Sequence, residues 1–567
     1  MSCAEPLLRT RGASVAIGWQ RVSAALLGRV GVGVLGLAAL ALWGWPLLGF
    51  LLGAVLPGLM HGDLRPSLQP LHDALGSGML AALRNSLLVA LAAAGLALPL
   101  GGWLAWLRVR SALAWRGWIE AGVWVLMVMP GYFLASGCML LAAPIGPLAS
   151  SPSALAAAQS LLGPLGIVLV MAFKALPFVF LALHASLEQA AAAPQEAARV
   201  LGLRPRQRLW LGVMLLLPAL VAGFAAAFAE SISDFAVAAT LGAGSGFTLA
   251  TYAIEQAVNA MPLNFPSAAA SSWMLLSLIV PALLLQSGAS RAGRSMRTLG
   301  PRHRPAPAVV LGARATALHL SGVMLIGMAT LGMPVLAALS LAFGSGANDA
   351  LAYQSVLGAF AYSLRLALVA ASMTLVFAWP IANLVNQSGR AARVLDLVLL
   401  AVMVLPGIVL ASAYVLVYNQ PITPLYGGST LLAMAYVALA LPATVKVLQG
   451  PLAQLHQALV ETAQVHGLSR WQALRAIELP LLAKPLFSAW LLAVLHIAFE
   501  LPASELLYPA GSPPLAVALL DAAAGFQLQL QARLQLLGIG LLLAFATLAY
   551  LAFGRLRAGA VADSLNP

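Results

Sequence analysis

The most distinctive polar pattern in this sequence is a glutamate followed by a glycine six residues later, and it occurs twice. The segments are EAARVLGLRPRQRLWLGVMLLLP (196–218) and ETAQVHGLSRWQALRAIELP (461–480). A carboxylate is favoured at a helix N-terminus by the helix dipole, and glycine can adopt a tight turn. We therefore expect each segment to form a short surface helix starting at the glutamate, a turn, and a second amphipathic stretch. A proline at a helix start then leads back into the next long helix.

The other candidate residues are isolated charges inside or beside long apolar runs. Lys174 lies in the middle of one run, and Glu230 and Glu500 end two others at matched places. Because charges are costly at membrane depth, such residues are candidates for a pathway, a gate or a contact with a docked protein. Snorkelling to the interface is the alternative for the two glutamates. The segments that follow add two more candidates, Asp234 and Glu505.

No set of residues in this chain has the spacing of a catalytic or metal site. The two cysteines form no CxxC pair, and the eight histidines are scattered. The glycine-rich GAGSGF at 242–247 lacks the lysine of a phosphate-binding loop. We expect no catalytic residue, no metal ligand and no cofactor in the chain itself.

The elements that position these residues are membrane helices. Only 8% of the 567 residues are charged and 61% are hydrophobic, whereas a soluble domain has about 25% charged residues. The apolar runs have the length of ~20 residues that a helix needs to cross a bilayer. The sequence predicts an all-α polytopic membrane protein with about twelve spans, at 30–57, 85–106, 118–143, 161–184, 209–229, 268–287, 317–343, 363–385, 394–419, 427–447, 481–499 and 532–554.

The basic residues predict the orientation of these spans. Arginines gather in alternate loops, while the remaining loops carry most of the acidic residues outside the spans. Since cytoplasmic loops are enriched in Lys and Arg, both termini are expected in the cytoplasm of a bacterium, with the spans in its inner membrane. This distribution also explains the net charge of +13 without nucleic-acid binding.

The two halves of the chain are internal repeats. MVMPGYFLAS at 127–136 and MVLPGIVLAS at 403–412 share seven of ten residues at an offset of 276. Ser86 and Ser363 open the preceding spans, and after the third span of each half the offset falls to 265. We expect two parallel six-helix lobes, with the first span of each unmatched in sequence. The predicted boundaries are a tail at 1–29, lobes at 30–287 and 317–555, a basic linker at 288–316 and a tail at 556–567.

The two Glu–Gly segments resemble the EAA motif of binding-protein-dependent ABC importer permeases. The second segment fits except at Thr462, and the first departs after its glycine. The resemblance implies that these segments couple the permease to two cytoplasmic ATPase subunits, which carry ATP and Mg, and that a periplasmic binding protein delivers the solute. The residues it implicates in ATPase coupling are Glu196, Ala197, Ala198, Gly202, Glu461, Thr462, Ala463, Gly467, Ile477, Leu479 and Pro480.

The segments at 230–257 and 498–519 are similar to stretches of ferric-iron importer permeases. This similarity favours ferric iron as the solute, with thiamine, polyamine, phosphonate or another small solute as alternatives. The rival class is an ion-coupled secondary transporter, which also has twelve spans in two halves. Span interiors nearly free of carboxylates and the paired docking segments argue against it.

Overall fold

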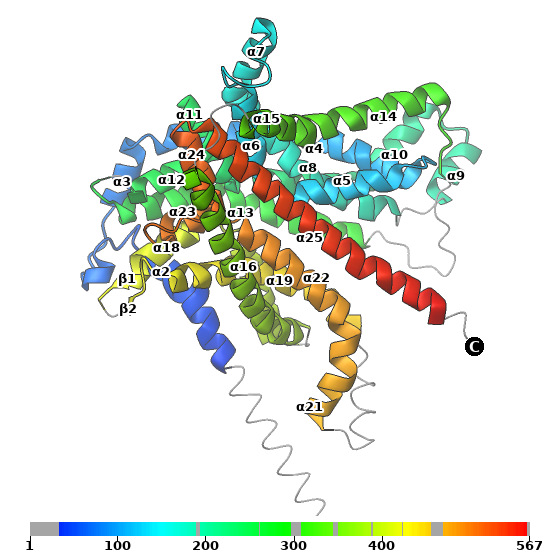
Figure 1. Cartoon of the computed structure of the whole chain (residues 1–567). Coiled ribbons are helices and arrows are strands. Elements are labelled where there is room, and N and C mark those ends of the chain that lie inside the picture. The colour runs from blue at the N-terminus through cyan, green and yellow to red at the C-terminus, as the bar shows by residue number, and fades with distance from the viewer. Residues whose placement is uncertain are drawn as a thin grey trace, which may run out of the picture.

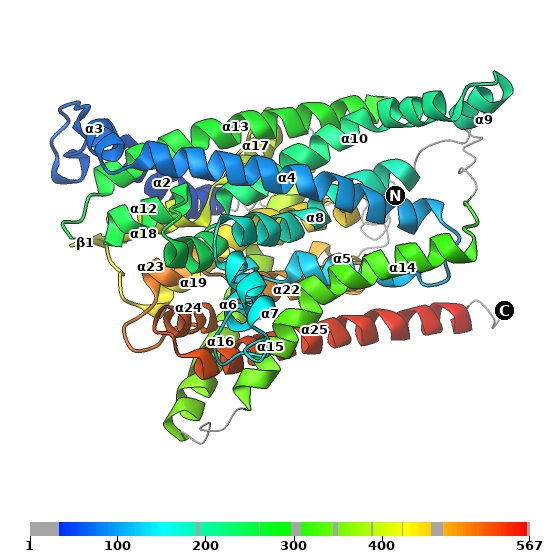
Figure 2. The same ribbon diagram turned by 90° about the horizontal axis from the view of Figure 1, so that it is seen from above.

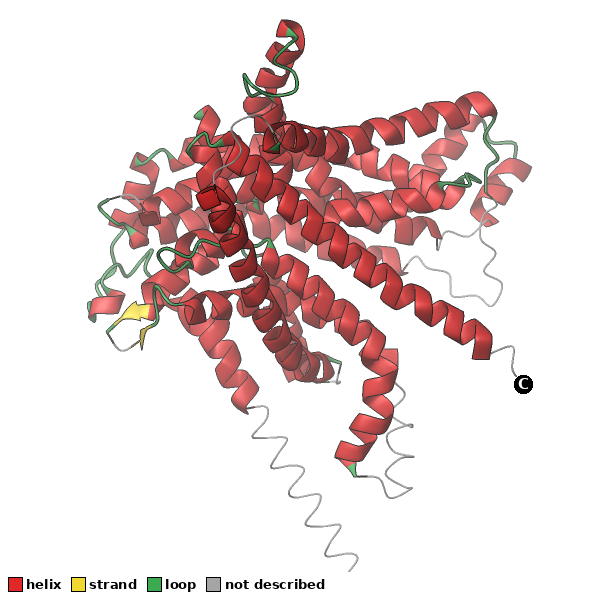
Figure 3. Ribbon diagram, in the orientation of Figure 1, coloured by secondary structure: helices red, strands yellow, loops and turns green. Residues whose placement is uncertain are grey.

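The computed structural model describes residues 33–188, 193–259, 261–295, 308–343, 350–386, 389–421, 423–454 and 469–563. These residues are almost entirely helical (Figure 3). Their only sheet is a small antiparallel hairpin of β1 (Asn419–Gln420) and β2 (Thr423–Pro424), in which Asn419 pairs with Pro424. The predicted all-α class is confirmed.

Within the described residues, ten helices are long and apolar enough to cross a membrane, or twelve structures if two bent helix pairs are each one span. Each predicted span has a counterpart among them. The ten are residues 33–52, including η1 (Leu40–Gly44) and α2 (Trp45–Leu52); α4 (Met79–Arg110); α8 (Pro164–Glu188); α10 (Pro205–Ser233); α13 (Phe265–Ser295); α14 (Ala313–Gly327) continued by η5 (Met328–Gly332) and α15 (Met333–Ala342); α16 (Ala350–Val385); α19 (Ser429–Gln454); η6 (Leu474–Glu478) with α22 (Leu479–Ala498); and α25 (Leu528–Asp563).

Two of the predicted spans, 118–143 and 394–419, are bent helix pairs in the structure. The first is broken into α5 (Arg116–Val128) and α6 (Gly131–Leu141), which meet at 92°, and the second into α17 (Arg390–Val404) and α18 (Gly407–Tyr418), which meet at 99°. The breaks fall at the Pro-Gly pairs of the repeated motif. A residue before proline is disfavoured in the α conformation, and Met129 and Leu405 accordingly adopt extended ψ angles of 123° and 127°.

Short helices connect these long ones. They are η2 (Leu59–His61), α3 (Gln69–Gly76), α7 (Pro152–Gln159), η3 (Ser160–Leu162), α9 (Ala193–Val200), η4 (Ala238–Gly242), α11 (Ala243–Ser245), α12 (Ala250–Asn259), α21 (Arg470–Ala473), α23 (Pro502–Leu507) and α24 (Leu515–Ala524).

The internal repeat extends to individual hydrogen bonds. The Ser86 hydroxyl accepts a bond of 2.8 Å from the N–H of Ala250, the first residue of α12. The Ser363 hydroxyl accepts one of 2.6 Å from the N–H of Leu515, the first residue of α24. A helix N-terminus has N–H groups without partners inside the helix, so each serine satisfies one of them. The N-terminus of α12 in the first lobe and that of α24 in the second are therefore held by equivalent serine hydrogen bonds.

The first span of each lobe is matched after all, contrary to the sequence prediction. The segments LALWGWP (40–46) and MATLGMP (328–334) both contain a π-helical turn that ends at a glycine two residues before a proline. Proline cannot donate a backbone hydrogen bond and its ring crowds the carbonyl four residues earlier. A π turn just before the proline is one local rearrangement that accommodates it. Only three of the seven residues are identical, so sequence comparison alone missed the match.

The first span of each lobe packs against the other lobe. Helix α2 lies along α18, and α15 lies along α6. The indole of Trp43 donates to the carbonyl of Ala438 at 3.0 Å, and the Tyr414 hydroxyl donates to the carbonyl of Leu42 at 2.9 Å. At the symmetric place, a Cβ on Gly137 would lie only 2.4 Å from the Cβ of Pro334. The first span of each lobe thus packs on a helix of the other lobe, and one side of each of these spans contacts protein.

The helices continue into the predicted linker and C-terminal tail. Helix α13 ends at Ser295 instead of residue 287, α14 begins at Ala313, and α25 ends at Asp563. Within the linker, Val309 lies beside the end of α4, where its N–H donates to the Arg110 carbonyl at 2.7 Å.

The long helices diverge from the region where the lobes meet. In Figure 1, α5 and α10 of the first lobe run to one side, while α16, α19 and α22 of the second lobe run to another. Both sets start near α6, α18 and α23. Figure 2 shows α9 at the far end of α10, remote from α23 and α24. The functional candidates therefore fall into two groups, one at the meeting point of the lobes and one at the far ends.

Candidate functional site

Lys174 lies at the centre of an ion triad in the first lobe. Its ammonium contacts the carboxylate of Asp234, whose side chain is 1% exposed, and lies 3.1 Å from that of Glu230, which is 31% exposed. Asp234 also accepts the N–H of Val237 at 2.7 Å, in the first turn of the helical segment that follows α10. Asp234 is therefore a buried acid. Glu230 is paired with Lys174 rather than snorkelling alone.

Glu500 is a buried carboxylate at the break between α22 and α23. It is 7% exposed and accepts the N–H groups of Ala503 at 2.9 Å and Ser504 at 3.0 Å. A carboxylate at this position satisfies N–H groups that have no partner inside α23. Among the described residues it forms no ion pair. Glu500 is too buried in this conformation to snorkel or to contact a docked protein.

The counterpart of Glu500 in the first lobe is Asp234, and not Glu230 as the sequence suggested. Both acids follow the end of the fifth long helix of their lobe and cap the short segment after it. In each lobe, the glycine of the Pro-Gly pair lies close to that lobe's acid. A Cβ on Gly131 would lie 3.3 Å from Asp234 Oδ2, and a Cβ on Gly407 would lie 3.6 Å from Glu500 Oε1. The missing side chain lets the broken helix lie against the carboxylate.

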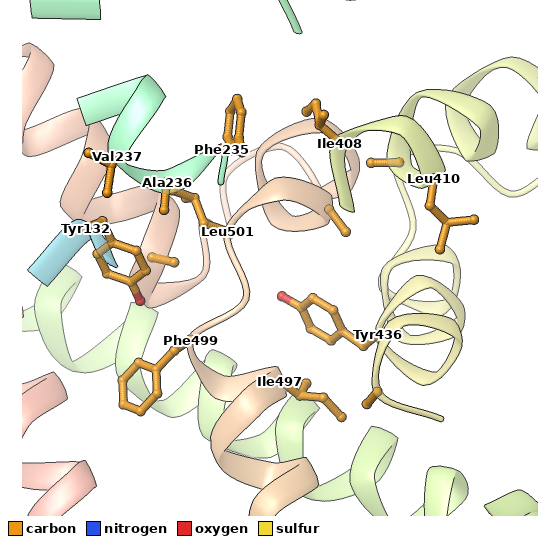
Figure 4. Close-up of a cluster of buried hydrophobic side chains, with 14 of the residues drawn as sticks. Tyr132, Phe235, Ala236, Val237, Ile408, Leu410, Tyr436, Ile497, Phe499 and Leu501 are labelled. Carbon is orange, nitrogen blue, oxygen red and sulfur yellow. The ribbon is translucent and has the colours of Figure 1, made fainter. Parts of the chain in front are cut away.

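Aromatic side chains from both lobes surround this place. Tyr132 of α6 and Tyr436 of α19 are 1% and 3% exposed, and both interact electrostatically with Glu500. Figure 4 shows their hydroxyl groups pointing from opposite sides toward the chain between Phe499 and Leu501. The Tyr436 hydroxyl is 2.7 Å from that of Ser504. The Phe499 ring packs edge-on against that of Phe133, 5.4 Å between centroids, so aromatic side chains of the two lobes are in direct contact.

His496 was not predicted as a site residue, yet it faces the ion triad from the second lobe. It is exposed while Leu495 and Ile497 beside it are buried. Its electrostatic partners are Glu230 and Lys174. Its lone position in an apolar run gave no periodic signal by which sequence reasoning could have found it.

Three carboxylates from both lobes form a second group of acids. They are Glu255 of α12, Glu505 of α23 and Asp521 of α24, and Glu505 is repelled by the other two. Burial raises the pKa of Glu505 to about 7, and the charges of Asp521 and Glu255 add to the rise. Burial also raises the pKa of Glu255 and of Asp521. Glu505 Oε2 is buried and has no hydrogen-bond partner among the described residues.

The first Glu–Gly segment forms the predicted short helix and turn, but the stretch after the turn belongs to the single helix α10, which contains Pro218 in its interior. Helix α9 begins at Ala193, three residues before Glu196, which still lies in the first turn. Gly202 follows the helix with φ of +67°, a left-handed conformation that favours glycine, and the Leu203 N–H donates to the Ala198 carbonyl at 3.0 Å. The helix thus ends in a Schellman-type turn.

Helix α9 presents apolar side chains to the outside. Val200 is 87% exposed and Leu201 is 77% exposed, and Glu196 and Ala197 are also exposed, whereas Ala198 is buried. Exposed apolar residues on a protruding helix are typical of a surface that binds another protein.

In the second Glu–Gly segment, Glu461, Thr462, Ala463 and Gly467 lie outside the described residues. The helix that follows begins at Arg470, and Pro480 does not start it as predicted. Ile477 belongs to the π-helical turn η6, and Leu479 and Pro480 continue directly into α22. The π turn accommodates Pro480 within one continuous helix, as in the first span of each lobe.

The two segments nevertheless lead into their long helices in the same way. The side-chain oxygen of Gln207 accepts the N–H of Arg204 at 2.9 Å, and that of Gln472 accepts the N–H of Ser469 at 2.8 Å. These pairs are at the predicted offset of 265 residues. A glutamine that returns to the first N–H of its own helix is one half of a capping box.

An acid on each broken helix was also missed, although it lies at the offset of 276. Glu120 of α5 pairs with Arg108 of α4 at 2.7 Å, and Asp396 of α17 pairs with Lys446 of α19. The acid is repeated, but its basic partner comes from a different helix in each lobe. Comparing the motifs position by position would have found the acids, but not their partners. Within the described chain, no group of three or more His, Cys, Asp or Glu residues is placed to hold a metal ion.

Comparison with known proteins matches both lobes to one family. The model of the binding-protein-dependent transport system inner membrane component matches residues 97–298 and again residues 374–561. The chain is also 26% identical over 335 residues to the thiamine transport system permease protein ThiP of Escherichia coli and, equally, to that of Salmonella typhimurium. The aligned region spans 57% of this chain and 61% of each relative.

Two matches to the same family model, one in each half, agree with the repeated helices and hydrogen bonds of the structure. The chain is a multi-pass membrane protein and belongs to the family of binding-protein-dependent transport system inner membrane components.

Proposed function

We propose that this chain is the permease subunit of an ATP-driven importer, in which it forms the whole translocation path. The observation that carries the proposal is the repeated family match, because each match contains one Glu–Gly segment of the kind that binds an ATPase in this family. The chain contains no phosphate-binding loop of its own, so ATP and Mg belong to two separate cytoplasmic ATPase subunits.

Helix α9 and the undescribed segment at 455–468 are the proposed contacts with those subunits. The exposed Val200 and Leu201 give α9 an apolar surface at the far end of α10, remote from the meeting point of the lobes. This surface fits a role in docking. A periplasmic binding protein would deliver the solute at the opposite side, near α12 and α24, with both termini of the chain in the cytoplasm.

For the solute, the comparisons favour thiamine over ferric iron. The relatives are named as thiamine permeases, whereas the similarity to ferric-iron permeases rests on two short segments. The groups at the meeting point of the lobes fit an organic cation, because carboxylates there stand beside tyrosine rings. Ferric iron prefers a tight set of hard oxygen ligands, and the described residues offer none.

The first experiment is co-purification of the chain with its ATPase, followed by uptake in proteoliposomes with the binding protein. We expect two ATPase subunits per chain, and accumulation of radiolabelled thiamine that requires ATP. Replacing Val200 and Leu201 by serine should reduce ATPase binding, while Leu64→Ser, at an exposed leucine outside the spans, should not. A permease that stays folded but binds no ATPase would contradict the importer function. Uptake of ferric iron instead of thiamine would contradict only the solute.

A further inference from the structure

Glu500 and Asp234 are equivalent acids with different partners. Asp234 contacts the ammonium of Lys174, so its charge is balanced within the first lobe. The residue at the corresponding place in the second lobe is Leu439, which follows from the repeated Ala-Leu-Pro at 175–177 and 440–442. A leucine there supplies no positive charge. Glu500 is therefore a buried acid that the second lobe caps with hydrogen bonds but does not neutralise.

An unneutralised buried carboxylate is costly, so its retention needs a reason beyond capping. A serine or asparagine also satisfies N–H groups at a helix N-terminus, without the cost of burying a charge. The carboxylate offers something that those residues do not, which is a negative charge at the interface between the lobes whenever it is deprotonated. Such a charge attracts a cation that enters from outside the chain.

The hydroxyl of Tyr132 supplies a second, independent observation. Its side chain is 1% exposed and its oxygen has no hydrogen-bond partner among the described residues. A buried polar group without a partner is rare and calls for an explanation. The hydroxyl points toward the chain between Phe499 and Leu501, and Tyr436 points to the same place from the second lobe (Figure 4). Both tyrosines interact electrostatically with Glu500.

We propose that Glu500, Tyr132 and Tyr436 form the site in the translocation path that binds the positive group of an organic cation while the lobes change access. This proposal rests on the proposed function and specifies the chemistry of its solute. The carboxylate balances the charge, the faces of the two rings attract the cation, and the Tyr132 hydroxyl accepts a hydrogen bond from the solute. Thiamine fits this description because its thiazolium ring has a fixed positive charge and its pyrimidine ring carries an amino group.

The site draws on both lobes. Tyr132 comes from α6 of the first lobe, and Glu500 and Tyr436 come from the second. A movement that separates α6 from α23 would therefore divide the site and release the cation. In the present conformation all three side chains are at least nine-tenths buried, so the site is closed.

The test measures binding to the purified full-length chain by equilibrium dialysis. The probes are radiolabelled thiamine and tetramethylammonium, with a neutral isostere of thiamine, in which carbon replaces the thiazolium nitrogen, as competitor. Glu500→Gln removes the charge but keeps an oxygen that can cap α23. We expect it to weaken the binding of both cations by about 30-fold or more, as expected when one partner of a buried charge pair is lost. The isostere should compete poorly with thiamine.

Two further variants and a control separate binding from folding. Leu439→Lys places an ammonium where the first lobe has Lys174, and it should abolish cation binding by pairing with Glu500. Tyr132→Phe should weaken thiamine more than tetramethylammonium, which cannot donate a hydrogen bond. Glu188→Gln removes an acid of α8 whose side chain is 55% exposed, and should leave binding unchanged. Retained binding of the ATPase shows that each variant is folded.

Each outcome bears on the proposal. Equal binding by the wild type and Glu500→Gln, competition by the neutral isostere as strong as by thiamine, or no cation binding by the wild type would overturn it. Binding of tetramethylammonium but not of thiamine, lost in Glu500→Gln, would support the cation site and contradict thiamine as the solute.

Discussion

Replacing Lys174 by methionine tests whether the ion triad holds the end of α10 in place. The substitution removes the ammonium and keeps a long, flexible side chain. Asp234, whose side chain is 1% exposed, would then keep only the hydrogen bond from the Val237 N–H. No other described cation forms an ion pair with it. The variant therefore buries a carboxylate without a counter-charge.

The expected loss follows from the burial of each partner. Breaking a buried ion pair by removing one member costs about 3–5 kcal/mol. Because the Lys174 side chain is 22% exposed, we expect a loss at the lower end, ~3 kcal/mol of the free energy of unfolding. Glu230 is 31% exposed, so Glu230→Gln should cost ~1 kcal/mol or less.

A double-mutant cycle measures the interaction directly. The variants are Lys174→Met, Asp234→Asn and the two together, each unfolded by denaturant in detergent and followed by tryptophan fluorescence. The Asp234→Asn substitution keeps a side-chain oxygen for the Val237 N–H, so the double variant lacks both charges but retains the cap. We expect it to be more stable than the sum of the single losses predicts, by ~2 kcal/mol or more. Additive losses would refute the reasoning, because they would show that the two side chains act independently.

Three further predictions concern the turn, the outer carboxylates and the paired serines. Gly202→Ala places a residue with a Cβ in the left-handed conformation of the turn after α9, at a cost of ~1 kcal/mol of the turn's stability, and should weaken co-purification of the ATPase. Gly212→Ala, at a helical position of α10 with open space around it, should leave co-purification unchanged. Because burial raises the folded-state pKa of Glu505 to about 7, the folded chain holds its proton at a pH where the unfolded chain has released it. The unfolding temperature in detergent should therefore fall as the pH rises from about 5 to about 8, and less steeply in Glu505→Gln; an equal slope in both would contradict the assignment. Ser86→Ala and Ser363→Ala each leave a buried N–H without its partner and should lower the free energy of unfolding by similar amounts, ~1 kcal/mol, in denaturant titrations, whereas a loss in only one variant would count against equivalent lobes.

Features that depend on local composition could be predicted from the sequence. The spans follow from the length of the apolar runs, since a helix crossing hydrocarbon must satisfy its backbone internally and present apolar side chains over ~20 residues. The short helix at Glu196 and the turn at Gly202 follow from preferences of single residues. Similarly, the repeat was recognisable wherever matching residues kept a constant spacing.

Features that depend on residues far apart in the chain could not be predicted. The motif MVMPGYFLAS has the composition of a span, yet the chain bends by 92° at its Pro-Gly pair, and α6 beyond the bend packs against α8, η4 and, in the other lobe, α15 and α25. Hydropathy measures how apolar a segment is and carries no information about its direction. For the same reason the prediction that Glu230 is the counterpart of Glu500 was wrong, since it relied only on both residues ending an apolar run.

The sequence by itself determined the class, the number of apolar runs, the two-lobe repeat and the Glu–Gly segments, because each is written in the types and spacing of neighbouring residues. Only the tertiary structure decided which charges meet. Lys174 and Asp234 are 60 residues apart and pair directly, whereas Glu500 has Leu439 where a lysine would stand. The interaction energy of a charge buried in a low-dielectric interior depends on its neighbours in space. Those neighbours come from different helices and from both lobes.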